Sequence, residues 1–206
     1  MPSLYLTFLG TAVLVLGAAR ADKLPSLDGD CACSLVESQI PQRIFYPVSP
    51  TYNESLSSYY SAQESDLQPA CIFTPTDAAE VSMFIKIINR KAGDSARRAT
   101  RPRFAIRSGG HTIWAGAANI EGGITVDMRS MNSLVLSPDK KVAMLGVGGI
   151  WSEIYEQLVP YNLTVMGGRV AGIGVGGLAT GGEFTWVVNK VMITIELTES
   201  RYTRGN

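Results

Sequence analysis

The sequence predicts one α+β domain, because a predicted strand and helix are followed by several short strands and a second helix. The chain has 206 residues, of which 46% are hydrophobic, so it can form one domain with a real core but not two large ones. Its 18 basic and 18 acidic side chains cancel. This neutrality argues against nucleic acid as a partner.

The first 21 residues have the pattern of a secretory signal peptide. Leu4 to Leu16 is an almost unbroken apolar run, and Ala19 and Ala21 form an A-x-A-like cleavage site. The run is shorter than the roughly 20 residues that span a bilayer, which argues against the alternative of a membrane anchor. We therefore expect a secreted protein that begins at Asp22 and has no membrane partner after cleavage.

Secretion would place the three cysteines in an oxidising compartment. Cys71 is expected to pair with Cys31 or Cys33, and the spacing does not choose between the two. Asn53 and Asn162 each begin an Asn-X-Ser/Thr tripeptide, so both are possible glycosylation sites.

Residues 22–67 are polar and weakly periodic, and they predict an irregular lead-in with one helix over residues 34–39. A short strand is predicted over residues 69–73. The later pattern predicts strands at residues 104–106, 124–128, 133–136, 141–147, 163–166 and 191–197, and a helix at residues 150–158.

The first long helix is predicted just after the first strand. Thr76 or Asp77 can cap it, apolar residues follow at helical spacing, and Gly93 is a suitable stop. A basic cluster follows, which we interpret as a solvated loop because no aromatic residues interleave with it. It consists of Arg97, Arg98, Arg101 and Arg103.

The single histidine lies at the end of the pentapeptide Arg107-Ser108-Gly109-Gly110-His111. Two consecutive glycines allow a tight turn whose N–H groups form a concave anion site. The pentapeptide follows the strand at residues 104–106, and ligands commonly bind at such strand ends. The alternative is a surface turn before a solvated imidazole.

A second glycine-rich segment covers residues 167–182. Gly172, Gly174 and Gly177 satisfy the G-x-G-x-x-G pattern of a dinucleotide-binding Rossmann unit. Adjacent glycines at 181 and 182 disfavour the helix that this unit requires. The pattern also begins too late in the chain for a doubly wound sheet, so a nicotinamide site is an alternative that we discount.

Taken together and in order, these segments resemble the PCMH-type FAD-binding domain of the berberine-bridge-enzyme-like FAD-linked oxidases, within the vanillyl-alcohol oxidase superfamily, with fungal secreted members most similar. The resemblance covers residues 68–182 and implies the N-terminal part of that domain, with the substrate domain absent and residues 183–206 as an unrelated tail. The segments that carry it are Arg107–Thr112, Trp114–Gly116, Glu121–Met128, Gly146–Trp151, Gly167–Val170 and Gly174–Gly177.

The resemblance implies a role for individual residues. His111 matches the histidine that is bonded to the C8α methyl group of FAD. A second attachment through cysteine occurs in some members, but Val170 occupies that position here, so we expect a single attachment. The backbone of Arg107, Ser108, Gly109 and Gly110 would supply donors to the pyrophosphate, and Thr112 and Gly116 would continue that loop. The ribityl chain and ring edge would lie along Gly167, Gly168, Gly174, Gly176 and Gly177.

The family chemistry implies oxidation of an alcohol, a sugar or a secondary metabolite, with hydride transfer to the flavin and dioxygen as the acceptor. The catalytic base would come from the substrate domain, so we assign no catalytic residue here, and we assign no metal site. Two hypotheses follow: a module of an FAD-linked oxidoreductase that needs further sequence to act on its small-molecule substrate, or a truncated product that binds FAD weakly or not at all.

Overall fold

The structure is a computed structural model that describes residues 29–89 and 102–182, and the backbone of residues 194–196 and 199–203. The predicted signal peptide lies outside the described residues. So do Gly93, Arg97, Arg98 and Arg101.

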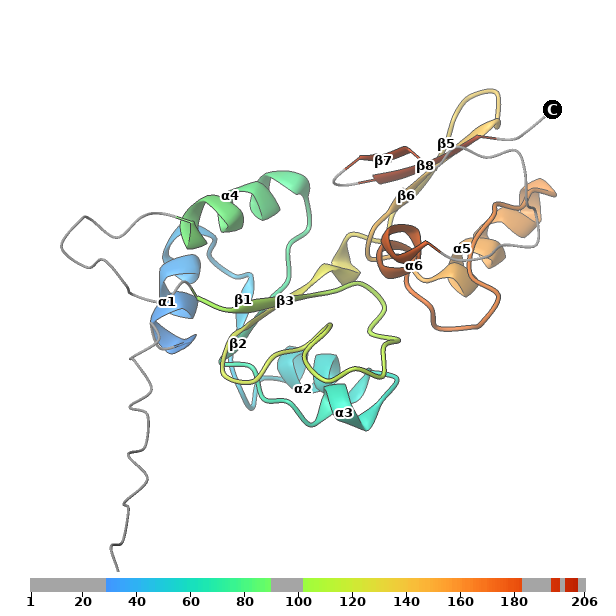
Figure 1. The fold of residues 1–206 in the computed structure, drawn as a ribbon. Coiled ribbons are helices and arrows are strands. Elements are labelled where there is room, and N and C mark those ends of the chain that lie inside the picture. Colours follow the sequence, from blue (N-terminus) through green and yellow to red (C-terminus); the bar gives the residue numbers. More distant parts are fainter. Residues whose placement is uncertain (1–28, 90–101, 183–193, 197–198, 204–206) are drawn as a thin grey trace, which may run out of the picture.

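The N-terminal half is built on a mixed four-stranded sheet with the order β1-β2-β4-β3 (Figure 1). Strands β2, β4 and β3 are parallel, and β1 is antiparallel to β2 at one edge. The strands are β1 (Ile44–Phe45), β2 (Cys71–Phe73), β3 (Phe104–Arg107) and β4 (Ile124–Asp127).

Helices cover both faces of this sheet (Figure 1). Helices α1 (Gly29–Gln39) and α4 (Ala78–Ile88) pack on one face, where Phe73 and Phe84 stack with their ring centroids 5.0 Å apart. The shorter helices α2 (Pro50–Ser57) and α3 (Ala62–Ser65) lie on the other face. Because both faces are covered, the central strands are fully buried, as is usual for parallel strands.

The second half is an antiparallel sheet with the order β5-β6-β8-β7, which lies beside the first sheet in Figure 1. Trp151, Leu145 and Val175 belong to its core and are fully buried. The elements are η2 (Met128–Ser130), β5 (Leu134–Leu136), β6 (Val142–Gly146), α5 (Trp151–Leu158), η3 (Val159–Tyr161), α6 (Val175–Gly181), β7 (Thr194–Glu196) and β8 (Glu199–Thr203).

The α+β class and most of the predicted elements are confirmed. Helix α4 begins where the cap predicted it, because the Asp77 carboxylate accepts a hydrogen bond from the Glu80 N–H at 2.9 Å. Helix α1 is longer than the predicted helix over residues 34–39 and begins at Gly29. The prediction of an otherwise irregular lead-in is wrong, because β1, α2 and α3 also lie within it. The backbone of residues 199–203, in the segment we interpreted as an unrelated tail, pairs with β6.

The strand predicted over residues 163–166 is wrong. These residues are irregular, and the apolar side chains of Leu163, Val165 and Met166 pack against the second core instead. Their apolar character, which suggested a strand, reflects burial against this core rather than pairing in the sheet.

The expectation that adjacent glycines would prevent a helix in the glycine-rich segment is also wrong. Residues Val175–Gly181 are helical despite their glycines, because tertiary packing of the buried Val175 outweighs weak local propensity. No strand precedes this helix between residues 162 and 174. The βαβ unit of a Rossmann site is therefore not formed there.

The structure also resolves the disulfide choice. Cys33 of α1 is bonded to Cys71 of β2, while Cys31 is exposed and remains a free thiol. The bond links the lead-in to the central sheet.

Candidate cofactor site

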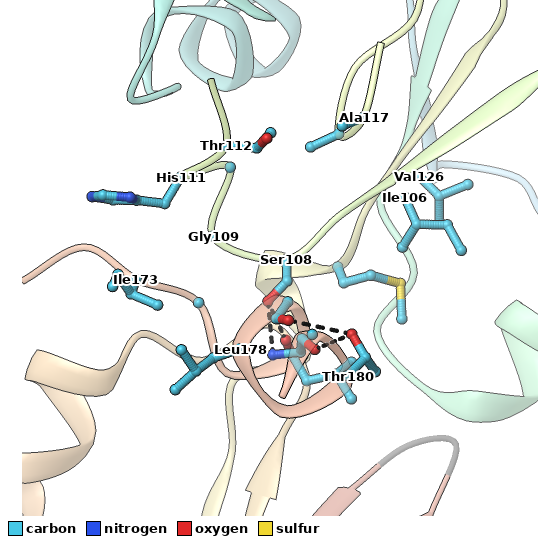
Figure 2. Close-up of a pocket in the computed structure, with 18 of the residues that line it drawn as sticks. Ile106, Ser108, Gly109, His111, Thr112, Ala117, Val126, Ile173, Leu178 and Thr180 are labelled. Atoms are coloured by element: carbon cyan, nitrogen blue, oxygen red, sulfur yellow. Dashed lines mark hydrogen bonds between the residues drawn. The ribbon is translucent and has the colours of Figure 1, made fainter. Parts of the chain in front are cut away.

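A cavity of about 810 Å³ lies where the loop after β3 meets the glycine-rich segment that enters α6. This volume is in the range of small-molecule and cofactor sites. Figure 2 shows Ile106 and Val126 on one side of Ser108, and His111 on the other. The predicted residues that line the cavity are Ser108, Gly109, Gly110, His111, Thr112, Gly174, Gly176 and Gly177.

The loop after β3 presents consecutive backbone amides at this cavity. Within the described part of the chain, the N–H groups of residues 109–112 donate no hydrogen bond. Gly110 has a φ of +71°, a left-handed conformation that favours glycine and allows the tight turn. Since backbone amides in protein interiors are normally paired, these four donors fit an anionic group such as a pyrophosphate. We call the N–H groups of residues 109–112 the nest.

Ser108 joins this loop to α6. Its hydroxyl donates to the Val147 carbonyl at 2.7 Å and accepts from the Gly176 N–H at 3.0 Å, and Figure 2 shows it pointing toward α6. The two backbones also touch directly: a β-carbon on Gly109 would lie 2.5 Å from the nitrogen of Gly174. Glycine is therefore required where the two predicted segments meet.

Arg107 does not line the cavity, and its side chain supports this loop from the side of α2. Its side chain is 1% exposed and donates to the carbonyls and hydroxyls of Ser55 and Ser58. The guanidinium also lies 3.8 Å over the Tyr59 ring. The resemblance implied a backbone donor from Arg107 to the pyrophosphate, and the side chain of this residue anchors α2.

A buried charge network continues from Arg107. Asp127 lies 3.9 Å from the Arg107 guanidinium and forms a 2.8 Å ion pair with Arg129. Burial acts to raise the pKa of Asp127, but the hydrogen bonds and charge of Arg129 and the charge of Arg107 outweigh it and hold this pKa below its ordinary value. Burial lowers the pKa of Arg107, although the Asp127 charge opposes that shift. The network fixes the ends of β3 and β4 beside the cavity.

His111 lies at the edge of the cavity and is half-buried. Its ring stacks on Tyr60, with the centroids 4.0 Å apart and the planes 16° apart. Gly172 comes close to the ring as well, since a β-carbon there would lie 3.6 Å from Cδ2 of His111. The imidazole is therefore held between two segments that are distant in the sequence.

The remaining predicted residues lie outside the cavity lining. Gly116 is exposed in a turn with a φ of +87°, and Val170 is 56% exposed. Gly167 and Gly168 pack against the indole of Trp151, where a β-carbon would overlap the ring. In this structure, Gly167 and Gly168 therefore allow the backbone to pack closely against Trp151 of the second core.

Several lining residues were missed by the sequence reasoning. Phe104 and Ile106 are partly exposed on the edge strand β3 and face the cavity, and this alternation with buried Ala105 and Arg107 was the available signal. Glu64 supports another part of the lining, because its buried carboxylate accepts from the amides of Ala117 and Ala118 at 3.0 Å, and both alanines line the cavity. Nothing in the local sequence around Glu64 pointed to that role.

Two further findings concern the described residues alone. No group of three histidine, cysteine or acidic side chains among them is placed to hold a metal ion. None of the helices in these ranges is long and apolar enough to cross a membrane.

Sequence comparisons identify the family of the chain. The FAD binding domain family matches residues 69–195, which is more than half of the chain and extends beyond Gly182. The chain is 38% identical over 154 residues to the FAD-dependent monooxygenase sdcF of Emericella nidulans, covering 75% of this chain. It is 39% identical over 155 residues to the FAD-dependent monooxygenase drtC of Aspergillus calidoustus, also covering 75% of the chain. The chain spans only 30% and 28% of the lengths of these two relatives.

Solved structures share the fold. A Phl p 4 variant described as a glucose oxidase has a TM-score of 0.58 at 23% identity, over 74% of this chain and 31% of its own. A variant of berberine bridge enzyme in complex with (S)-reticuline has a TM-score of 0.56 at 20% identity, over 79% of this chain and 32% of its own. With the motifs, the nest and the family match in agreement, the chain belongs to the FAD binding domain family and has the fold of the berberine-bridge-enzyme-like oxidases.

Proposed function

We propose that this chain is the FAD-holding part of a flavin-dependent oxidoreductase, with FAD bonded covalently to His111 and to no other residue. The whole protein would oxidise a small organic substrate, an alcohol, a sugar or a secondary metabolite, with dioxygen as the final acceptor. The names of the relatives, FAD-dependent monooxygenases, support an oxygen-using flavin chemistry. Because the chain spans under a third of their length, this activity is a proposal for the complete protein.

The observation that carries the proposal is the row of four amides at residues 109–112, which have no partner among the described residues and include the amide of His111, whose imidazole lies at the edge of the cavity. The amides would bind the pyrophosphate, and Ser108 would keep α6 close to it. His111 would then lie within reach of the group to which the pyrophosphate is attached. This arrangement separates anion binding from covalent attachment along one short loop.

Each protein group has a definite task in this scheme. When bound, FAD supplies an acceptor for a hydride, and attachment of an imidazole makes it a stronger acceptor. His111 would hold FAD through one ring nitrogen, which would give up its proton on attachment, and dioxygen would serve as the oxidant for this bond. The apolar wall that includes Ile106 and Val126 would exclude water from the other part of the cavity.

The test is the substitution His111→Ala in the 206-residue chain, produced with FAD. We expect the unaltered chain to retain yellow, fluorescent flavin after acid precipitation, and the variant to retain none while still binding FAD reversibly. Near-UV circular dichroism checks that the variant is folded. Acid-stable flavin in the variant would contradict the attachment, and nicotinamide binding that survives the substitution would favour the Rossmann alternative.

One observation favours a second candidate, a flavin-binding chain that has no oxidase activity on its own. Of the described residues that line the cavity, His111 is the only one with a titratable side chain. A general base within hydrogen-bond reach is needed to take the substrate proton. Hydrogen peroxide production from alcohols or sugars by the isolated, FAD-loaded chain would exclude this candidate.

We also propose that the protein is secreted and glycosylated. The Cys33–Cys71 disulfide supports an oxidising compartment. Asn53 and Asn162 are both exposed, as glycan attachment requires. A shift in mass after enzymatic removal of N-glycans from the secreted protein would test both points.

A further inference from the structure

The feature that the proposed function leaves unexplained is the contact between His111 and an exposed tyrosine. Tyr60 is 64% exposed, yet its ring stacks on the imidazole at 4.0 Å rather than extending into solvent. Exposed aromatic side chains lose conformational freedom when they are held in one place. We therefore ask what the contact does for His111.

The backbone around Tyr60 is tied to the loop that carries His111. The N–H of Tyr60 donates to the carbonyl of Gly110 at 3.1 Å, one residue before the histidine. The hydroxyl of Ser61 donates to the carbonyl of Thr112 at 2.9 Å, one residue after it. These two hydrogen bonds place the Tyr60 backbone in a fixed register with both neighbours of His111.

Tyr59, the residue before Tyr60, also fixes the position of this segment. Tyr59 is buried, its hydroxyl donates to the carbonyl of Ala118 at 2.8 Å, and its ring lies under the Arg107 guanidinium. In the segment Tyr59–Ser61, two side chains thus hold the loop through its backbone. The third, Tyr60, is the one that lies against the reactive ring.

We propose that Tyr60 is a positioning residue, which holds the His111 imidazole in the orientation that attachment of FAD requires. The inference rests on the proposed attachment at His111. A histidine side chain at the edge of a cavity otherwise samples several rotamers, and only some of them direct a ring nitrogen at the bound group. A stacked ring on one face, with Gly172 close to the ring edge, restricts those rotamers before FAD arrives.

The experiment compares Tyr60→Ala, Tyr60→Phe and the control Tyr161→Ala in the 206-residue chain without a histidine tag. FAD is added to the apoprotein, and acid-stable flavin fluorescence is followed with time, while total bound flavin is measured separately. We expect Tyr60→Ala to slow covalent attachment about 2- to 10-fold without loss of total flavin, since an aromatic pair contributes in that range. Tyr60→Phe keeps the ring and should match the unaltered chain, as should Tyr161→Ala.

His111 is the single histidine of the chain, so its ring proton signals in an NMR spectrum need no assignment by mutation. Stacking on Tyr60 should shift them upfield in the apoprotein, and Tyr60→Ala should remove the shift while Tyr60→Phe retains it. This measurement needs no flavin. An unchanged attachment rate in Tyr60→Ala, or equal slowing in Tyr60→Phe, would overturn the positioning role.

The two failures can be told apart. If the unaltered chain forms no acid-stable flavin at all, the proposed attachment is refuted, and the positioning role falls with it even where the NMR shift is present. If the unaltered chain does form it, and Tyr60→Ala forms it equally fast, only the inference about Tyr60 is refuted.

Discussion

At the scale of single residues, the shape of the cavity depends on charged side chains that do not line it. Arg107 and Asp127 are both almost completely buried, and the Ser55 hydroxyl links them. This hydroxyl accepts a hydrogen bond from the Arg107 guanidinium and donates one to the Asp127 carboxylate at 2.7 Å. Removing one partner from such a pair leaves the other charge buried without compensation. The loop that lines the cavity is therefore held by residues that lie outside the cavity lining.

We predict that Asp127→Asn lowers the free energy of unfolding at neutral pH by about 3 kcal/mol, because Arg107 loses its buried counter-charge. The native pKa of Asp127 lies below the ordinary 3.8. Its contribution is therefore present above the unfolded pKa and lost as the pH falls through the native pKa. Chemical denaturation of both proteins as a function of pH measures the difference, which should shrink below pH 3.8.

The matched control for this charge change is Glu156→Gln, on the exposed side of α5. A surface substitution of this kind should change the free energy of unfolding by less than about 0.5 kcal/mol. A difference for Asp127→Asn that stays constant down to the lowest pH would contradict the charge argument.

At the scale of elements, the site is a junction between β3 and α6. Strand β3 directs the nest into the cavity, and α6 begins against it, with Gly174 in contact with the Gly109 backbone. Neither element could make this contact with a β-carbon at either position, because the obstructing atoms are backbone and cannot rotate away.

We therefore predict that Gly174→Ala lowers the free energy of unfolding by about 1–3 kcal/mol and weakens FAD binding, because overpacking must separate α6 from the loop. Gly177→Ala is the matched control for stability, since no atom lies within 4 Å of a β-carbon at that helical position. It should leave stability unchanged or raise it by up to about 1 kcal/mol through helix propensity. Equal destabilisation by both substitutions would show that the close approach is not the cause.

At the scale of the whole molecule, the lead-in is part of the fold. Helix α1 supplies three buried residues to the first core, Ile40 follows directly after the helix, and Cys33 of α1 is bonded to Cys71 of the central sheet. The three residues of α1 in this core are Ala32, Cys33 and Val36. The region before the family match therefore stabilises the sheet that carries the cavity.

We predict that the double substitution Cys33→Ala and Cys71→Ala lowers the free energy of unfolding by about 2–4 kcal/mol, because the bond closes a loop across a sequence separation of 38 residues. Cys31→Ser is the control and should have little effect, since this thiol is exposed and free. Urea denaturation measures both. Peptide mapping under non-reducing conditions should recover a Cys33–Cys71 peptide, and a Cys31–Cys71 peptide would show that the pairing is different.

The sequence by itself determined the α+β class, the cap at Asp77, the glycine turn before His111 and the family, because these depend on local patterns and on motif order. Only the tertiary structure decided which cysteine is bonded, that residues 163–166 form no strand, and that Arg107 supports the nest from the side of α2. It also decided that Tyr60 lies on His111. These outcomes depend on which segments meet in space, and spacing along the chain carries no information about contacts between residues about 50 positions apart.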